Sequence, residues 1–101
     1  MVTSMNKQQH LLLKLSEECS EVIKEVHKIL LFGLNNIGPN DSKTNLEKLQ
    51  IELNHLFAAV EMLHEVGVPW RIDNKVVIQK KSQVKEFMKY AKIRGTLEED
   101  I

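Results

Sequence analysis

The sequence has a single cysteine, no excess of either charge and no long apolar run. One cysteine, Cys19, excludes an intrachain disulfide framework and fits a reducing compartment. Basic and acidic residues both number 14, so the net charge gives no reason to expect nucleic acid or an anionic membrane as a partner. No apolar stretch approaches the ~20 residues that span a bilayer, and the polar start lacks a signal-peptide pattern. We expect one soluble, cytoplasmic domain covering residues 1–101.

Strand patterns and low-complexity tracts are also missing. Apolar residues recur instead at steps of three and four, which predicts an all-α chain. The helices are expected at about 6–32, 44–66 and 74–93, followed by a loose tail at 96–101. A glycine that can end a helix stands just beyond each of them, at Gly33, Gly67 and Gly95.

Each predicted helix carries one apolar seam. The first seam consists of Leu12, Leu15, Cys19, Val22, Val26 and Ile29, the second of Leu46, Leu49, Leu53, Leu56, Val60 and Leu63, and the third of Val77, Val84, Met88 and Ala91. We therefore expect Cys19 to be a buried core thiol. Further apolar strips lie beside the first two seams, and one short chain cannot cover them all. The predicted fold is a three-helix chain whose helical bundle is completed by homo-oligomerisation, as a homodimer or homotetramer.

Polar residues stand at the same helical phase beside the first two seams. Glu18 and Glu21 on the first helix correspond to Glu52 and His55 on the second. Spacings of three or four residues place side chains on one helix face, so two packed helices can direct all four toward a common point. Such a site could hold one or two Mg²⁺ ions and leave positions open for water and phosphate oxygens, which favours hydrolysis of a polyphosphate.

A solvated, charged helix surface is the alternative interpretation of these glutamates. Lysines stand near them at salt-bridge spacings, among them Lys14 and Lys28. Glu18 and Glu52, however, are expected to be partly buried beside their seams, and burying a carboxylate is unfavourable without a cation or another partner. This consideration favours the metal site.

Three residues outside the carboxylate rows are candidate substrate contacts. Lys81 belongs to a basic face of the third helix that can meet a triphosphate, Trp70 can stack on a base, and Asn45 can hydrogen-bond a sugar or phosphate. Each also has a structural interpretation. These are a solvated basic surface for Lys81, an aromatic plug at the bundle end for Trp70 and a local helix cap for Asn45.

The pattern Glu17-Glu18-x-x-Glu21, followed after a gap by Glu52-x-x-His55, resembles the signature EExxE…ExxD of the MazG-like all-α nucleoside triphosphate pyrophosphohydrolases. Segments 11–18 and 57–63, together with Phe32-Gly33 and Asn45, resemble the short single-domain members that phages often encode. The similarity covers about residues 11–63 well and the third helix loosely.

This resemblance implies Mg²⁺-dependent hydrolysis of a ribo- or deoxynucleoside triphosphate between its α and β phosphates, giving the monophosphate and pyrophosphate. It implies metal ligands at Glu18, Glu21, Glu52 and the position of His55. Glu17 and Glu18 would be catalytic, with Glu17 either a ligand or the group that orients the attacking water.

His55 stands where the family has aspartate. Imidazole favours Mn²⁺, Zn²⁺ or Ni²⁺ over Mg²⁺. Either the metal preference has changed, or the chain is catalytically silent and binds a nucleotide or a protein partner. A purely structural helical oligomer, with no metal, is a third alternative.

Overall fold

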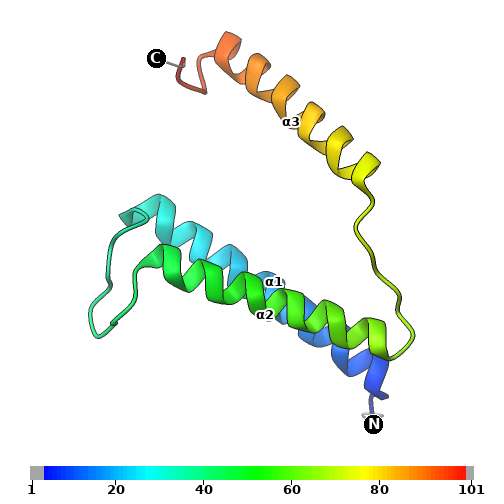
Figure 1. Cartoon of the computed structure of the whole chain (residues 1–101). Coiled ribbons are helices and arrows are strands. Elements are labelled where there is room, and N and C mark those ends of the chain that lie inside the picture. The colour runs from blue at the N-terminus through cyan, green and yellow to red at the C-terminus, as the bar shows by residue number, and fades with distance from the viewer. Residues whose placement is uncertain (1–3, 100–101) are drawn as a thin grey trace. The chain divides into compact units, whose positions relative to one another are not determined.

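A computed structural model describes residues 4–99 (Figure 1). Within them the chain forms three helices, α1 (Lys7–Phe32), α2 (Asn45–Glu65) and α3 (Asn74–Arg94). The predicted all-α, three-helix fold is confirmed, and each helix end lies within one residue of its expected place. None of the described helices is long and apolar enough to cross a membrane.

The chain divides into two compact units, Met1–Trp70 and Arg71–Ile101. The first contains α1 and α2, and the second contains α3. Each unit is therefore described by itself.

Polar side chains begin all three helices. Asn6 Oδ1 accepts a hydrogen bond from the backbone N–H of Gln9 at 2.8 Å, and Gln9 Oε1 accepts one from the N–H of Asn6 at 3.0 Å. Thr44 and Glu47 form the same reciprocal capping box at the start of α2. Asp73 Oδ1 accepts hydrogen bonds from the first backbone N–H groups of α3. These bonds satisfy donors that have no partner inside the helix.

Helices α1 and α2 pack side by side as an antiparallel hairpin (Figure 1). The residues that the contact shields recur every three or four positions, and we call them the packed faces of the two helices. On α1 they are Leu11, Leu15, Glu18, Val22, Glu25 and Ile29, and on α2 they are Asn45, Leu49, Glu52, Leu56, Ala59 and Leu63.

The packed faces correct the predicted seams. Leu15, Val22 and Ile29 lie on the packed face of α1 as expected. Leu12, by contrast, is 45% exposed, and Cys19 is an exposed thiol rather than a buried one.

The seam of α2 shifts in the same way. Leu49, Leu56 and Leu63 lie on its packed face as predicted, whereas Leu53 is 46% exposed. The apolar stripe of each helix is wider than the strip that one neighbouring helix covers, so only one edge of it is shielded. In the described chain the buried apolar residues are only Leu11, Ala59 and Leu63.

Helix α3 exposes most of its length. Three residues of its predicted apolar seam, Val77, Val84 and Met88, lie at the surface, while Ala91 is half-buried. The basic face that includes Lys81 is exposed as well. Large apolar side chains are thus exposed in both units, which indicates a partner or an oligomer.

The loop between α1 and α2 is tied to the hairpin by hydrogen bonds. Asn45, which is 2% exposed, donates from its side-chain Nδ2 to the carbonyl of Gly33 at 3.0 Å. The backbone N–H groups of Asn45 and Leu46 donate to the carbonyls of Asn36 and Leu34, both at 3.0 Å. Gly33 itself has a φ of +95°, a conformation that favours glycine at the end of a helix.

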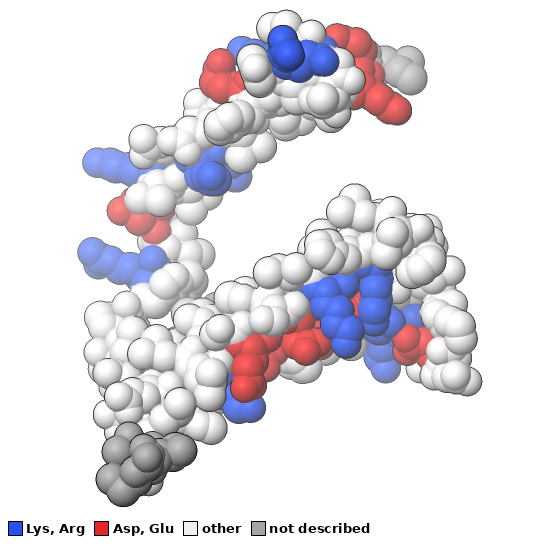
Figure 2. Space-filling view, turned by 180° about the vertical axis from the view of Figure 1, so that it is seen from behind, with Lys and Arg blue, Asp and Glu red and all other residues white. Residues whose placement is uncertain are grey.

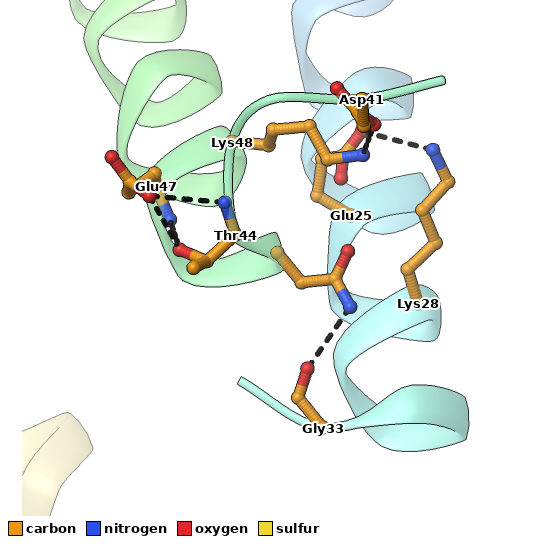
Figure 3. A network of polar contacts seen from close by, with 8 residues as sticks. Glu25, Lys28, Gly33, Asp41, Thr44, Glu47 and Lys48 are labelled. Carbon is orange, nitrogen blue, oxygen red and sulfur yellow. Dashed lines mark hydrogen bonds and ion pairs between the residues drawn. The ribbon is translucent and has the colours of Figure 1, made fainter. Parts of the chain in front are cut away.

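Four charged side chains gather beneath this loop (Figure 3). Lys48 of α2 bonds to Asp41 of the loop at 2.6 Å, and Lys28 lies 3.6 Å from Glu25, both on α1. The bond to Lys48 holds the pKa of Asp41 below its ordinary value of 3.8. In return it holds the pKa of Lys48 above 10.5. Glu25 is buried, and its Oε2 has no hydrogen-bond partner.

Replacing Asn45 with alanine tests the tie between loop and hairpin. Asn45→Ala leaves the Gly33 carbonyl without its donor, so we expect the free energy of unfolding to fall by about 1–2 kcal/mol. Urea denaturation followed by circular dichroism, at one fixed protein concentration, measures the change. Asn54→Ala is the matched control, because its side chain only bonds the Gln50 carbonyl on the same helix. A comparable loss in both variants would contradict the structural role of Asn45.

The Asp41–Lys48 pair predicts a pH dependence. Because the folded-state pKa of Asp41 is lowered, its stabilising contribution is complete above the unfolded-state value of about 3.9 and is lost as pH falls through the folded-state pKa. Lys48→Met should therefore raise the pKa of Asp41, measured by NMR titration of its carboxyl carbon. Lys43→Met, which removes a loop lysine outside the pair, should leave that pKa nearly unchanged. Equal shifts in both variants would show that no specific pair exists.

Candidate metal centre

Three candidate ligand atoms converge on the hairpin. Glu18 of α1 and Glu52 and His55 of α2 each offer one atom, and these atoms all lie within 4.8 Å of one another. His55 Nδ1 is 3.8 Å from Glu18 Oε2 and 3.3 Å from Glu52 Oε2. Within residues 4–99 this is the one such group of three or more histidine, cysteine or acidic side chains.

The packing of the helices explains this convergence. Glu18 and Glu52 lie on the two packed faces, where they are half-buried opposite each other. His55 follows Glu52 by three residues, nearly one helical turn, and so lies beside it at the edge of the contact. The His55 side chain is 56% exposed. One side of the group is therefore open to solvent.

The donor set fits a divalent transition metal. Ligand atoms at ~2.1 Å from a tetrahedral ion stand roughly 3.4 Å apart, and the two distances to His55 are close to that separation. Two carboxylates with one imidazole suit Zn²⁺ or Mn²⁺ better than Mg²⁺, which prefers oxygen ligands throughout. Two carboxylates this close repel each other unless a cation lies nearby. A protonated His55 can meet the same need, and this is the alternative to a metal.

The other predicted ligand and catalytic residues lie outside this group. Glu21 is half-buried on α1, one turn beyond Glu18. Glu17 is exposed, and its Oε2 is 3.0 Å from Lys14 Nζ. That hydrogen bond raises the pKa of Lys14. Glu17 therefore forms a surface ion pair of the kind that the charged-surface interpretation describes. Glu18 and Glu52 are partly buried.

The three candidate substrate contacts do not meet at this centre. The Asn45 side chain is engaged with the Gly33 carbonyl. Trp70 follows α2, where its ring meets Phe57 edge-on at a centroid distance of 6.5 Å. Lys81 is exposed on α3, which belongs to the other unit. The structure therefore places Lys81 on an exposed surface and Trp70 beside another aromatic ring. Asn45 bonds across the loop and is not a local helix cap, because Thr44 is the N-cap of α2.

A groove of about 510 Å³ adjoins the ligand atoms. Glu18 and His55 line it together with Lys14, and its remaining walls are His10, Leu11, Ala58, Ala59 and Met62. The sequence did not predict this groove, because His10, Ala58 and Met62 belong to none of the candidate sites described above. The signal that could have found it is their position in the helices. Each of them comes just before a residue of a packed face, so all three lie on the same side of the hairpin. In Figure 2 the charged side chains of the hairpin form a band along one face.

Comparison with known proteins gives no relative. No protein-family model matches the chain, and no curated protein or solved structure matches it either. The structure therefore establishes an all-α, three-helix protein with a possible Glu/Glu/His metal-binding group.

Metal titration tests the centre directly. We expect one Mn²⁺ or Zn²⁺ per chain by isothermal titration calorimetry, with an affinity that falls as the solution is acidified, because protons compete with the metal for the ligand atoms. Glu52→Gln should weaken binding by at least ~10-fold, since a ligand contributes no less than the outer partners that support it. Glu61→Gln removes an exposed carboxylate elsewhere on α2 and should have no effect. Equal weakening by both substitutions, or no binding at all, would rule out the site.

Proposed function

We propose that this chain is a metal-dependent nucleoside triphosphate pyrophosphohydrolase with a MazG-like fold, working as a homodimer or homotetramer. Its reaction converts a ribo- or deoxynucleoside triphosphate and water into the monophosphate and pyrophosphate. One observation carries the proposal: Glu18, Glu52 and His55 converge beside a groove. They occupy three of the positions at which the EExxE…ExxD resemblance implies metal ligands.

The residues around the groove suit the parts of such a substrate. Lys14 supplies a positive charge for the polyphosphate, and the apolar walls formed by Leu11, Ala58 and Met62 can hold an uncharged nucleoside. A divalent ion, when bound by the three ligands, neutralises phosphate charge and lowers the pKa of a water molecule.

Two glutamates complete this assignment. Glu21, one turn from Glu18, is available as a further ligand, in line with the resemblance. Glu17 would orient the attacking water, and this role requires it to leave the ion pair with Lys14. The same movement would free Lys14 for the substrate.

A catalytically silent protein that binds a nucleotide or a protein partner is the second candidate. Two observations favour it. His55 replaces the aspartate of the family pattern, and the Glu17 side chain is already paired with Lys14.

Pyrophosphate release from a panel of ribo- and deoxynucleoside triphosphates decides between the two. We expect turnover that is faster with Mn²⁺ than with Mg²⁺, because of the imidazole ligand. Glu18→Gln should reduce it by more than ~100-fold, since loss of outer partners alone removes 10–100-fold. Glu61→Gln serves as the control with unchanged turnover. His55→Asp should raise the rate with Mg²⁺, because it restores an all-oxygen ligand set.

If neither the parent chain nor His55→Asp releases pyrophosphate with any substrate and metal, the enzymatic proposal is overturned. Calorimetric titration of the same proteins with nucleotides would then show whether the binding role holds.

A further inference from the structure

A second cleft of the hairpin lies near the end of α2, away from the metal centre. It has a volume of about 330 Å³, and its walls are Phe57, Val60, Glu61, His64, Glu65 and Trp70. Phe57 and His64 each follow a packed-face residue, whereas His55 and Met62 of the groove each precede one. One step along a helix turns a side chain by ~100°, so the cleft and the groove lie on different sides of α2. The positions that follow packed-face residues hold no lysine, arginine, aspartate or glutamate on either helix.

Two aromatic rings form one corner of the cleft. The rings of Phe57 and Trp70 are nearly perpendicular, with an interplanar angle of 80° and a centroid distance of 6.5 Å. Both side chains are about half exposed. The face of an aromatic ring carries the negative part of its quadrupole and attracts a cation within about 6 Å of the centroid. The corner is therefore suited to a positive charge.

Two carboxylates stand at the same cleft. Glu61 and Glu65 are one helical turn apart, so their like charges repel each other. Glu65 is also the last residue of α2, where the helix dipole adds partial negative charge. Within residues 4–99, neither side chain forms an ion pair with a basic residue. A cation in the cleft would relieve both unfavourable effects.

His64 does not supply that cation. It is the one basic residue in the last turn of α2, and its Nδ1 accepts a hydrogen bond from the backbone N–H of Trp70 at 3.2 Å. An imidazole nitrogen accepts a hydrogen bond only when it carries no proton, so the ring is neutral in this arrangement. The bond also fastens Trp70, which follows the helix, to the last turn of α2.

We propose that this cleft binds an alkylammonium group, with the aromatic corner against its carbon atoms and the two carboxylates beside its charge. The volume lies near the lower end of the ~300–1,000 Å³ that small-molecule sites occupy, which suits a small amine better than a nucleotide. A metal ion is a poorer match. In the described part of the chain, the one group of three convergent ligand atoms is that of Glu18, Glu52 and His55. A free amine and the lysine side chain of a peptide both present the alkylammonium group.

This site goes beyond the proposed function and uses no property of the metal centre. Ammonium binding and metal binding can therefore fail independently. Glu61→Gln separates them, because it changes the cleft and should leave metal binding as in the parent chain.

Fluorescence titration of the full chain tests the proposal. Trp70 is the single tryptophan, so its emission reports on the cleft directly. The probes are putrescine, tetramethylammonium and the methylamide of acetyl-lysine, each added at constant ionic strength. We expect a saturable change in emission with at least one of them. Butanediol, which has the carbon chain of putrescine without its charges, is the matched control and should give no saturable change.

Substitutions in the cleft should weaken the binding of the probe. Glu65→Gln should raise the dissociation constant by about 2- to 5-fold, the range expected for an exposed ion pair. Phe57→Leu keeps an apolar side chain but removes the aromatic face, and we expect a loss of similar size. Glu86→Gln is the control for charge, because it removes an exposed carboxylate of α3 that is paired with Lys89, and it should leave the affinity unchanged.

The three probes also distinguish the sources of the ligand. Equal or tighter binding of the lysine derivative indicates a peptide partner, whereas preference for putrescine or tetramethylammonium indicates a free amine. The proposal is overturned if none of the three cations gives a saturable change, or if butanediol gives the same response. It is also overturned if Glu65→Gln and Phe57→Leu bind the probe as tightly as the parent chain.

Discussion

The contact between the packed faces of α1 and α2 is the constraint on which the rest of the hairpin depends. It brings Glu18 and Glu52 together, although two carboxylates in a partly shielded place repel each other. The helices nevertheless meet there, with apolar residues above and below. An arrangement that is unfavourable by itself and is held by its surroundings is typical of a functional site. A cation is the simplest partner for it, supplied either by a metal or by His55.

The same contact divides the hairpin into two sides with different chemistry. One side carries the groove, Lys14 and the ion pairs beneath the loop, and the other carries no charge. A wide apolar stripe on a helix is usually buried in a core. In this hairpin only the residues along one edge of each stripe are buried. The hairpin thus separates a side with charged residues and the possible metal-binding group from a side whose exposed apolar residues suggest a partner or an oligomer.

Local interactions made the helices and the helical phase of Glu18, Glu52 and His55 predictable from the sequence. Capping boxes, glycine stops and three-four spacing all act within a few residues. The convergence of Glu18, Glu52 and His55 followed from that phase match. The predicted seams were only partly correct, because Leu12 and Leu53 are exposed. Burial of such residues depends on how many helices pack against the helix, and the apolar pattern of the helix does not give that number. Asn45 was ambiguous for the same reason, since its partner at Gly33 lies across the loop.

The bond between Asn45 and Gly33 also has a consequence for how the chain can vary. It fixes where α2 starts relative to the end of α1, and every later pairing along the hairpin follows from that alignment. Residues between the two anchors can be added or lost as long as the loop still closes. An insertion between Gly33 and Glu18, or between Asn45 and Glu52, would instead rotate a carboxylate by ~100° away from its counterpart. The loop can therefore change in length during evolution, whereas the spacing from each anchor to the centre cannot.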